Sequence, residues 1–407
     1  MNHVSPAVAN LIERGAVIPN PAWVDVDPSI ALDRISPDIV IRGPCRLNGE
    51  TTSIGPGCVL GEEGAVTIEN CQLADRVRLK GGFFSGATIL SGVTFGSGAH
   101  VRPGTLLEEG VTCGHTVGLK QTVFMPFVAA GSLVNFCDAL MGGGTSPENH
   151  SEIGSSYVHF NYTPHHDKAT ASLIGDVPKG VMLDQPPVFL GGQGGLIGPI
   201  RLAFGTVIAA GTICRKDVAE AGMIVVGERA ASGRRRYEPG LYQDIRRILR
   251  NNFAYIGNLH ALLAWYGTAR ACFVVAEPYE QACLEGATFR LREMIAERVQ
   301  RLGELASNME RSLTLGVRRH GDALPDPPYA LQRRFMEGWA ELAPRLQRAP
   351  PPETGARNLE ALLSAIAALS TSRRFLDAIR DLDPDARTAG TAWLQAIVDA
   401  YANLAEL

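Results

Sequence analysis

Apolar residues recur at every sixth position along two stretches of the first half of the chain. They are Phe95, Val101, Leu107, Cys113 and Leu119, followed further on by Leu196, Leu202, Ile208 and Cys214. Glycine often follows the periodic residue, as in FGSGAH, CGHTVG and the earlier IGPGCVLG. Such a period fits a β-helix, in which each short strand points one side chain into an axial stack and glycine serves the tight corners. The pattern therefore predicts a mainly β domain, a parallel β-helix of hexapeptide repeats over residues 37–218, after an N-terminal extension over 1–36.

Beyond residue 218 the glycine repeat stops, and apolar residues recur at intervals of three and four. One such set fits a single helix face: Leu241, Ile245, Ile248, Leu249, Phe253, Ile256, Leu259 and Leu263. The segment 277–315 predicts a long helix, and the proline-rich segment 345–357 separates a last helical hairpin from it, because proline cannot continue a helix. We expect an α-helical C-terminal domain over 219–407 that caps the open end of the prism or mediates assembly, or else binds substrate.

The charge and cysteine content narrow the classes of partner. The formal net charge is −4, and Arg234–Arg236 is the longest dense basic run, so we expect no nucleic-acid partner. The eight cysteines form no CxxC pair and no apolar leader segment opens the chain, which favours reduced thiols in the cytoplasm. No stretch approaches the roughly 18 uninterrupted apolar residues of a membrane span, so we expect no membrane partner.

The segment VHFNYTPHHDK, residues 158–168, holds His159, His165 and His166. Histidine is the side chain that titrates near neutral pH, so this loop offers candidate general bases. It also offers metal ligands, three or four of which could come from His165, His166 and Asp167 with Cys137 and Asp138 or with His150. Their spacing matches no established zinc pattern, and we expect no metal. The remaining alternative is a solvated excursion from a repetitive scaffold.

Six segments follow one another between residues 100 and 218: HVRPGTLLEEG, GLKQ, AAGSLVNFCDALMG, HFNYTPHHDK, SLIGDV and GPIRLAFGTVIAAGTICRKDV. In this order they resemble the left-handed β-helix acetyltransferase domain of the bifunctional N-acetylglucosamine-1-phosphate uridyltransferase/glucosamine-1-phosphate acetyltransferase enzymes. Nothing resembles the uridyltransferase half, because residues 1–36 are too short for that domain and contain no glycine-rich nucleotide loop. The resemblance implies a left-handed β-helix and a homotrimer whose sites lie between neighbouring prisms.

The resemblance also implies which residues bind the acceptor. The matching positions are Arg102, Lys120, Asn161, Tyr162 and Lys168. The first two match the family's phosphate-binding cations, and an arginine fork with a mobile lysine suits an anionic sugar phosphate. On the residues alone, Arg102 could instead pair with a glutamate of the next coil, Glu108 or Glu109, and Lys120 could be a solvated surface residue.

The family's catalytic histidine is missing from this chain. Its place is taken by Ser132 in AAGSLVNF, and three residues later Asn135 replaces a tyrosine. A serine hydroxyl cannot by itself act as a general base near neutral pH. Three histidines of the acceptor loop are therefore our candidates for a replacement base: His159, His165 and His166. Ser132 and Asn135 stay candidate substrate contacts, and the alternative is a β-helix that lost catalysis and serves as a binding protein or scaffold.

A groove for the acyl donor is implied by two further matches, GGQGG at 191–195 and the segment that follows Ile208. The candidate donor contacts are Gly192, Ala209, Ala210, Arg215 and Lys216. Small residues would let the pantetheine arm of coenzyme A lie against a flat wall, and terminal cations suit its phosphates. Tight β-helix corners need the same small residues, so the pattern alone does not decide between the two roles.

The segment MGGGTSPENHSEIG, residues 141–154, is longer than the corresponding turn of the family. Long loops on a rigid scaffold often carry specificity, so this one fits a different acceptor, or else a surface excursion. The sequence thus favours an acyltransferase that acts on a phosphorylated or nucleotide-linked sugar with an acyl-coenzyme A, most simply acetyl-coenzyme A. The alternatives are a non-catalytic sugar-phosphate-binding or scaffold protein and a metal-dependent enzyme built on the histidine loop.

Overall fold

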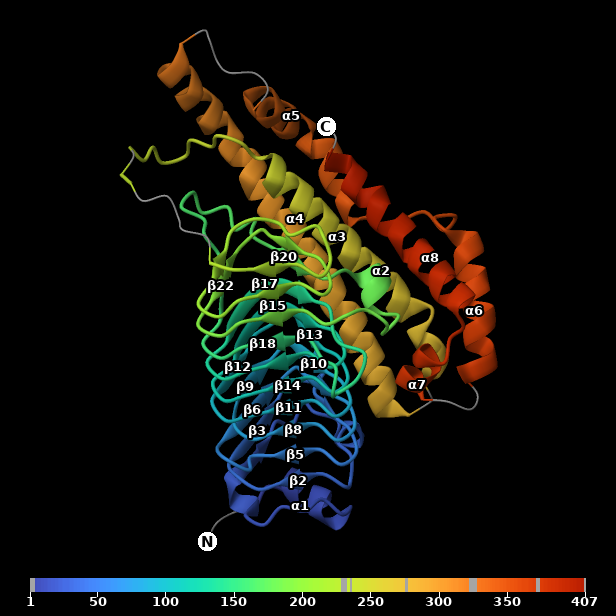
Figure 1. Ribbon diagram of the computed structural model, residues 1–407. Helices are drawn as coiled ribbons and strands as arrows, with labels where there is room; N and C mark the ends of the chain where they lie inside the picture. Colours follow the sequence, from blue (N-terminus) through green and yellow to red (C-terminus); the bar gives the residue numbers. More distant parts are fainter. Residues whose placement is uncertain are drawn as a thin grey trace.

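The computed structural model describes residues 4–227, 233–234, 236–274, 277–321, 328–370 and 374–405. Within these residues, parallel strands wind into a long three-faced prism, and helices lie along one side of it (Figure 1). The N-terminus lies at the free end of the prism, where α1 (Pro6–Glu13) buries Val8 and Leu11 against the prism core. The predicted left-handed parallel β-helix with C-terminal helices is confirmed.

Strands of successive coils pair in parallel on each of the three faces. The first face consists of β1 (Val24–Val26), β3 (Cys45–Asn48), β6 (Val66–Glu69), β9 (Gly82–Ser85), β12 (Ala99–Val101), β15 (Gly118–Phe124), β17 (Asn135–Met141), β19 (Val158–Phe160), β22 (Gly195–Ile197) and β25 (Ile213–Cys214). The second face consists of β4 (Ser53–Ile54), β7 (Gln72–Leu73), β10 (Ala87–Ile89), β13 (Thr105–Leu107), β20 (Ser172–Ile174) and β23 (Arg201–Leu202), together with the second halves of β15 and β17. The third face consists of β2 (Val40–Ile41), β5 (Val59–Leu60), β8 (Arg78–Leu79), β11 (Thr94–Phe95), β14 (Thr112–Cys113), β16 (Ala129–Ala130), β18 (Glu152–Ile153), β21 (Phe189–Leu190), β24 (Val207–Ile208) and β26 (Ile224–Val225).

The six-residue pattern fills the inside of the prism, and all nine periodic residues are buried. On the first face the inward residues of consecutive coils stack in register, since Leu119 pairs with Phe136 and His159 pairs with Leu196. The rings of Phe136 and His159 are 5.8 Å apart, which joins the two pairs into one column. One histidine thus occupies a place that neighbouring coils give to apolar side chains.

The prism is longer than the predicted range 37–218. It begins with β1, which pairs with β3, and it ends with β26, which pairs with β24. Residues 24–36 contain no glycine, so the repeat pattern did not reveal them as part of the β-helix. Both predicted domain boundaries therefore fall inside the prism.

The second face is apolar on both sides of its sheet. Leu107 and Phe124 point into the prism, while their sequence neighbours Leu106 and Val123 point outward and are also fully buried. The outward residues belong to the hydrophobic cluster of the helical region. Because both sides are covered, strands of this face carry consecutive apolar residues, as in TLL at 105–107.

Helices dominate the C-terminal half of the chain. They are α3 (Arg246–Gly267), α4 (Pro278–His320), α5 (Pro328–Gln347), α6 (Ala356–Ser370), α7 (Phe375–Arg380) and α8 (Pro384–Ala402), with the short α2 (Val177–Gly180) inserted between β20 and β21. The predicted long helix is confirmed as α4, and the proline-rich segment separates α5 from α6 as expected. Helix α4 lies against β4, β7, β10 and β13, so the helical region covers the length of the second face.

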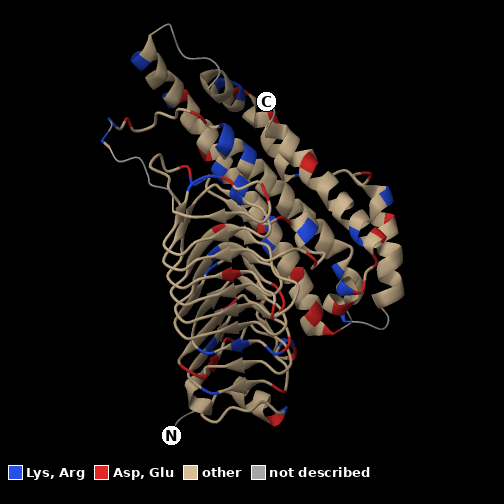
Figure 2. Cartoon of the chain, in the orientation of Figure 1, with Lys and Arg blue, Asp and Glu red and all other residues tan. Residues whose placement is uncertain are grey.

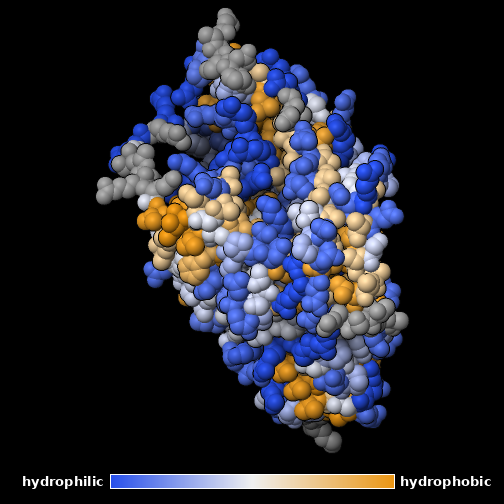
Figure 3. All heavy atoms as spheres, turned by 45° about the vertical axis from the view of Figure 1, so that its right-hand side comes forward, coloured by the Kyte–Doolittle hydropathy of each residue, from blue (hydrophilic) through white to orange (hydrophobic). Residues whose placement is uncertain are grey.

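The surface of the molecule is largely polar. Lys and Arg gather along α3 and α4 where these helices approach the last coils of the prism (Figure 2). The side of the molecule shown in Figure 3 is mostly hydrophilic, with apolar residues confined to patches. In the basic run, Arg234 and Arg236 are exposed and Arg235 lies outside the described residues. No helix in the described part of the chain is both long and apolar enough to cross a membrane.

A candidate anion-binding site

A small cavity of about 150 Å³ lies beside the corner between the first and second faces. Arg102, Lys120 and Cys137 line it from three consecutive coils. Lys120 and Cys137 are register partners, and Arg102 directly follows Val101, which pairs with Leu119. Adjacent strands lie about 4.8 Å apart, so parallel register brings these side chains together although they are 35 positions apart in the chain.

The histidine-rich loop supplies Asn161 and Lys168 to the same cavity. The Asn161 amide donates to the Asp138 carboxylate at 2.7 Å, and its oxygen accepts from the Thr170 hydroxyl at 3.0 Å. These contacts fix the orientation of the asparagine. The structure thus brings together four of the five residues assigned to the acceptor site, while Tyr162, 69% exposed, is not among the lining residues.

Helix α4 supplies the rest of the cavity wall with Glu297, Arg298 and Arg301. The Arg298 guanidinium donates through Nη2 to Asp138 Oδ1 at 2.6 Å. Arg301 donates to both Glu297 and Glu304, at 2.8–2.9 Å. The sequence offered no sign of this wall, because charged residues at such spacing are also what a solvated helix face carries.

The cations of the prism side of this cavity are not neutralised by carboxylates. Among the described residues, Arg102 donates only to the thiol of Cys137, at 3.2 Å, and neither Lys120 nor Lys168 has a carboxylate partner. Burial raises the pKa of the Cys137 thiol and the Arg102 charge opposes this, so the sulfur is a neutral partner. Three positive charges therefore face the cavity without forming ion pairs of their own among the described residues, while the two carboxylates of the lining, Asp138 and Glu297, pair with arginines of α4.

The alternative pairing of Arg102 with the next coil is wrong. Glu108 accepts from the Tyr266 hydroxyl at 2.6 Å, and Glu109 accepts from Arg270. Both acceptors are thus taken by residues at the end of α3 and just after it. Burial raises the pKa of the Glu108 carboxyl and Arg270 opposes this shift.

The structure removes His159 from the candidates for a catalytic base. Its ring is 4% exposed within the axial stack, and Nε2 lies 2.7 Å from the buried Ser172 hydroxyl. Burial lowers the pKa of His159 to about 4. A base must reach its proton donor, and this imidazole is enclosed by the prism core.

The other two loop histidines lie away from the cavity walls. His165 packs between the rings of Tyr237 and Tyr242, and its Nδ1 accepts from the Gly240 amide at 3.0 Å. Burial lowers the pKa of His165. His166 is exposed. The loop is thus anchored to the segment before α3, and this anchoring rather than a ligand accounts for His165.

The proposed metal cluster does not form in the described part of the chain, where no three His, Cys, Asp or Glu side chains converge as metal ligands. The Asp167 carboxylate accepts from the Tyr242 hydroxyl, and Asp138 accepts from Arg298. His150 Nδ1 lies 2.7 Å from the Pro147 carbonyl oxygen. Each carboxylate named for the cluster therefore has a protein partner.

Ser132 has an imidazole partner that sequence reasoning missed. His115 Nδ1 lies 2.7 Å from Ser132 Oγ at an exposed corner between the third and first faces. The parallel register explains this pair, because Cys113 is the partner of Ala130 and each is followed by glycine. The matching motifs CGH and AGS, 17 positions apart, are the signal that could have revealed it.

Three residues assigned to the acyl donor, Gly192, Ala209 and Ala210, lie along that same corner on later coils, whereas Arg215 and Lys216 follow β25 at the corner between the first and second faces. A side chain at Gly154 would lie 2.3 Å from the Gly192 amide, and one at Gly191 would lie 2.4 Å from the Ala210 amide. Such close stacking explains the small residues at these positions without any ligand. Arg215 donates to the Ile213 carbonyl at 3.0 Å, and Cys214 Sγ contacts the Lys216 carbonyl.

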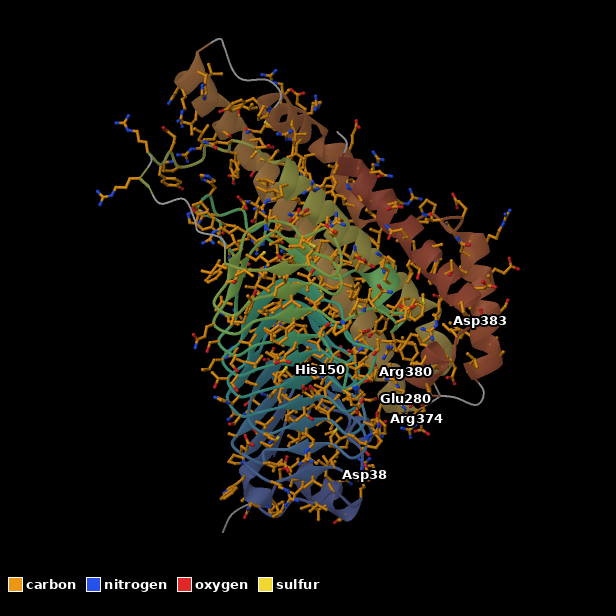
Figure 4. The ribbon with its side chains drawn as sticks, viewed as in Figure 1. Asp38, His150, Glu280, Arg374, Arg380 and Asp383 are labelled. Carbon is orange, nitrogen blue, oxygen red and sulfur yellow. The ribbon has the colours of Figure 1, made fainter. Side chains whose placement is uncertain are left out.

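The long insertion packs against the helical region. The Thr145 carbonyl accepts from Arg380 Nε of α7 at 3.1 Å, and Pro147 lines a cleft of about 960 Å³ between the prism, α4 and α7. Figure 4 labels several charged residues of this cleft, Asp38, Glu280, Arg374 and Arg380. Arg380 has Asp377 at 3.6 Å and the ring of Phe127 beneath it, and Arg270 is paired with Glu109. Two of the arginines that line the larger cleft thus have carboxylate neighbours, unlike Arg102 in the small cavity.

No protein-family model matches this chain. Curated relatives are bifunctional protein GlmU of Trichlorobacter lovleyi, 33% identical over 202 residues, and GlmU of Pelobacter propionicus, 31% identical over 210 residues. These matches cover 49% and 51% of this chain but only 38% and 40% of the relatives, so the chain spans about two fifths of their length. The prism is a left-handed β-helix, and the similarity to GlmU supports a domain of the hexapeptide-repeat acyltransferase type. The part of GlmU that it resembles is the C-terminal acetyltransferase half.

Solved structures that this chain partly resembles include LpxA from Acinetobacter baumannii, 12% identical with a TM-score of 0.22, over 52% of this chain and 72% of that one. A second is UDP-N-acetylglucosamine O-acyltransferase (LpxA) from Moraxella catarrhalis, 14% identical with a TM-score of 0.21, over 49% of this chain and 67% of that one.

Proposed function

We propose that the protein transfers an acyl group from an acyl-coenzyme A, most simply acetyl-coenzyme A, to a phosphorylated or nucleotide-linked sugar. The observation that carries this proposal is the small cavity in which Arg102, Lys120 and Lys168 meet without carboxylate partners among the described residues. Guanidinium and ammonium groups held together in this way bind phosphoryl oxygens through charge-assisted hydrogen bonds. The anionic end of the acceptor occupies this cavity.

In this proposal His115 and Ser132 carry out the proton transfer. With Nδ1 of His115 as acceptor, the Ser132 hydroxyl gives its proton to the imidazole as it takes one from the acceptor's amine or hydroxyl. The acceptor's oxygen or nitrogen forms a bond to the thioester carbonyl carbon, the carbon–sulfur bond breaks, and the leaving thiolate receives the proton from the imidazolium. A serine that cannot serve as a base alone thus gains a proton acceptor.

The geometry of the first face supports one site over two separate ones. Ser132 and Cys137 are five residues apart, so their Cα atoms are at most about 18 Å apart. Between them, Asn135 accepts a weak hydrogen bond from the Cys137 thiol at 3.7 Å and faces outward. The corner of Ser132 also continues into the edge of small residues at Gly192 and Ala210, along which we place the pantetheine arm. Asn135 is a proposed substrate contact between phosphoryl group and reacting atom.

Assembly and location are further parts of the proposal. The resemblance to GlmU supports a homotrimer and a cytoplasmic location. Arg215 and Lys216 remain the proposed partners of the coenzyme A phosphates, and a neighbouring prism would lie along the edge that carries Ser132. Sedimentation equilibrium tests this part, since a monomer at micromolar concentration contradicts it.

A binding protein without catalysis is the second candidate. The loss of the family's histidine at Ser132 favours it, because the phosphate-binding positions survive while the base does not. The two candidates differ over the acyl donor, since a transferase binds it productively and a binding protein has no need of it.

Calorimetric titration tests the proposed function. The full chain is titrated with coenzyme A and acetyl-coenzyme A, alone and with sugar phosphates and nucleotide sugars. A transferase is expected to bind the donor with micromolar affinity, and more tightly when its acceptor is present. Acceptor binding without donor binding supports the binding protein, and binding of neither contradicts both candidates.

A further inference from the structure

One buried arginine of the helical region lines the small cavity and has an unused donor. Arg298 of α4 is 2% exposed, and its Nη2 donates to Asp138. Its Nη1 is buried and has no hydrogen-bond partner among the described residues. A buried guanidinium donor without an acceptor is costly, and each such group in a native structure needs an explanation.

Arg301 stands next to Arg298 on the same face of α4. Residues three apart on a helix lie on one side, so both arginines face the cavity that they line. Two carboxylates, Glu297 and Glu304, hold Arg301 in place. Helix α4 therefore carries Arg298, which has an unused donor, and Arg301, whose side chain is held in position by carboxylates.

The cavity consists of two charged walls that belong to different halves of the chain. The prism wall carries Arg102, Lys120 and Lys168, and the helix wall carries Arg298 and Arg301. Among the described residues, two carboxylates line the cavity, Asp138 and Glu297. Five basic groups around two acidic groups leave an excess of positive charge in a partly open cavity, which an anion would relieve.

We propose that α4 completes the anion site within one chain, so that the Arg298 guanidinium binds the same phosphoryl group whose other side is held by Arg102 and Lys120. This inference rests on the proposed anion site and adds ligand contacts from the helical region. The ligand group is a terminal phosphoryl dianion. A cavity of about 150 Å³ is smaller than typical ligand pockets of about 300–1,000 Å³, so the sugar remains outside it.

Asp138 has a definite place in this arrangement. It occupies one donor of Arg298 and also accepts from Asn161, so it orients both residues. Its charge also repels a phosphoryl group in the same cavity. Removing that charge while keeping the shape should therefore strengthen phosphate binding in this cavity. This variant tests the location of the anion, and the Arg298 variant tests the role of α4.

The test is calorimetric titration of the full chain with inorganic phosphate and with glucosamine 1-phosphate at low ionic strength. Arg298→Lys keeps the charge opposite Asp138 but loses the second donor, and we expect it to weaken phosphate binding at least tenfold. Asp138→Asn is expected to strengthen binding at least threefold. Arg292→Gln is the matched control, because Arg292 is an exposed arginine of the same helix outside the cavity. It should bind phosphate as the parent chain does.

A measurement on the unmodified chain covers the case in which Arg298→Lys does not fold. Saturating phosphate should slow hydrogen exchange of α4 amides around Arg298 at least threefold, and leave α8 unchanged. If Arg102→Ala weakens phosphate binding but Arg298→Lys does not, the anion site stands and the role of α4 is overturned. Absence of phosphate and sugar-phosphate binding in the parent chain overturns both.

Discussion

Arg102 differs from Arg78 of the same prism because it has no carboxylate partner among the described residues. Arg78, on the third face, donates to Glu62 at 2.7 Å, whereas Arg102 contacts only a thiol. We expect Arg102→Ala to weaken sugar-phosphate binding about 10- to 100-fold, since a charge-assisted contact contributes about 1.5–3 kcal/mol. Calorimetric titration measures the change.

Arg78→Ala is the control for this substitution. It removes an arginine from the same solenoid at a surface ion pair, and such exposed pairs contribute little. Equal affinities of the Arg102→Ala variant and the parent chain would remove Arg102 from the site.

His115 carries the second prediction at the residue scale. We expect His115→Ala to lower kcat about 100- to 10,000-fold with little change in KM, because the imidazole accepts the proton and does not hold the phosphoryl group. Ser132→Ala should cost a similar factor, and the double variant no more than either single change, since the two act as a unit. Steady-state kinetics with the acceptor found by calorimetry measures these factors.

His150→Ala is the matching control, because His150 is a partly exposed histidine of the insertion. A His115→Ala variant that keeps full activity would exclude the pair from catalysis.

Residue patterns predicted the prism wall of the candidate site and missed its helix wall. Arg102 and Lys120 stand in motifs whose order is informative, so they could be assigned before any coordinates. Arg298 and Arg301 stand in ERVQR, a sequence that any exposed helix carries. His159 was wrongly proposed as a base. A histidine in a polar segment gives no sign that its side chain points into the prism, in line with the inward residue of the next coil. Only the register between coils supplies that information.

At the scale of elements, the docking of α4 depends on a close approach at Gly286. A Cβ there would lie 2.3 Å from Gln72 Oε1 and 2.7 Å from Thr88 Oγ1, two groups that hydrogen-bond to each other on the second face. We expect Gly286→Leu to lower the free energy of unfolding by about 1–3 kcal/mol, because the helix must move away from the sheet. Denaturant titration followed by circular dichroism measures this change.

Gly338→Leu on α5 is the control, since no described atom beyond its own turn of helix lies within 4 Å of the position that its Cβ would take. It should leave stability unchanged or slightly higher, as replacing glycine inside a helix does. Similar losses in both variants would mean that leucine in a helix, and not contact with the prism, causes the effect.

The elements themselves were predictable, and their docking was predictable only in part. A period of six residues marks the prism and a period of 3.6 residues marks the helices. Each period shows which residues of an element face its core. The docking face could have been found, since TVF at 122–124 and ALM at 139–141 place apolar residues on both sides of a strand. Which helix covers it depends on contacts between residues more than a hundred positions apart, and no local pattern records these.

For the whole molecule, His159 makes stability depend on pH. Its pKa is about 4 in the folded chain, lowered by burial, against about 6.5 when free. Below pH 6.5 the unfolded chain gains a proton that the folded chain does not take up until about pH 4, so stability falls across this window. We expect a loss of about 2 kcal/mol between pH 7 and 4.5 from this group. Denaturant titrations at both values measure it.

His159→Leu provides the comparison, because Leu196 occupies the next position of the same column. The variant should lose less stability between the two pH values than the parent chain loses. Equal losses in the two proteins would show that other groups cause the acid sensitivity.

The length of α4 changes the way in which the β-helix unfolds. In a stack whose coils touch only their neighbours, unfolding can begin at one end and advance coil by coil. Helix α4 has 43 residues and is about 65 Å long, and it touches β4, β7, β10 and β13 together. No one of these coils can open without uncovering part of the helix. The helix thus connects these coils, so that they unfold together as one cooperative unit.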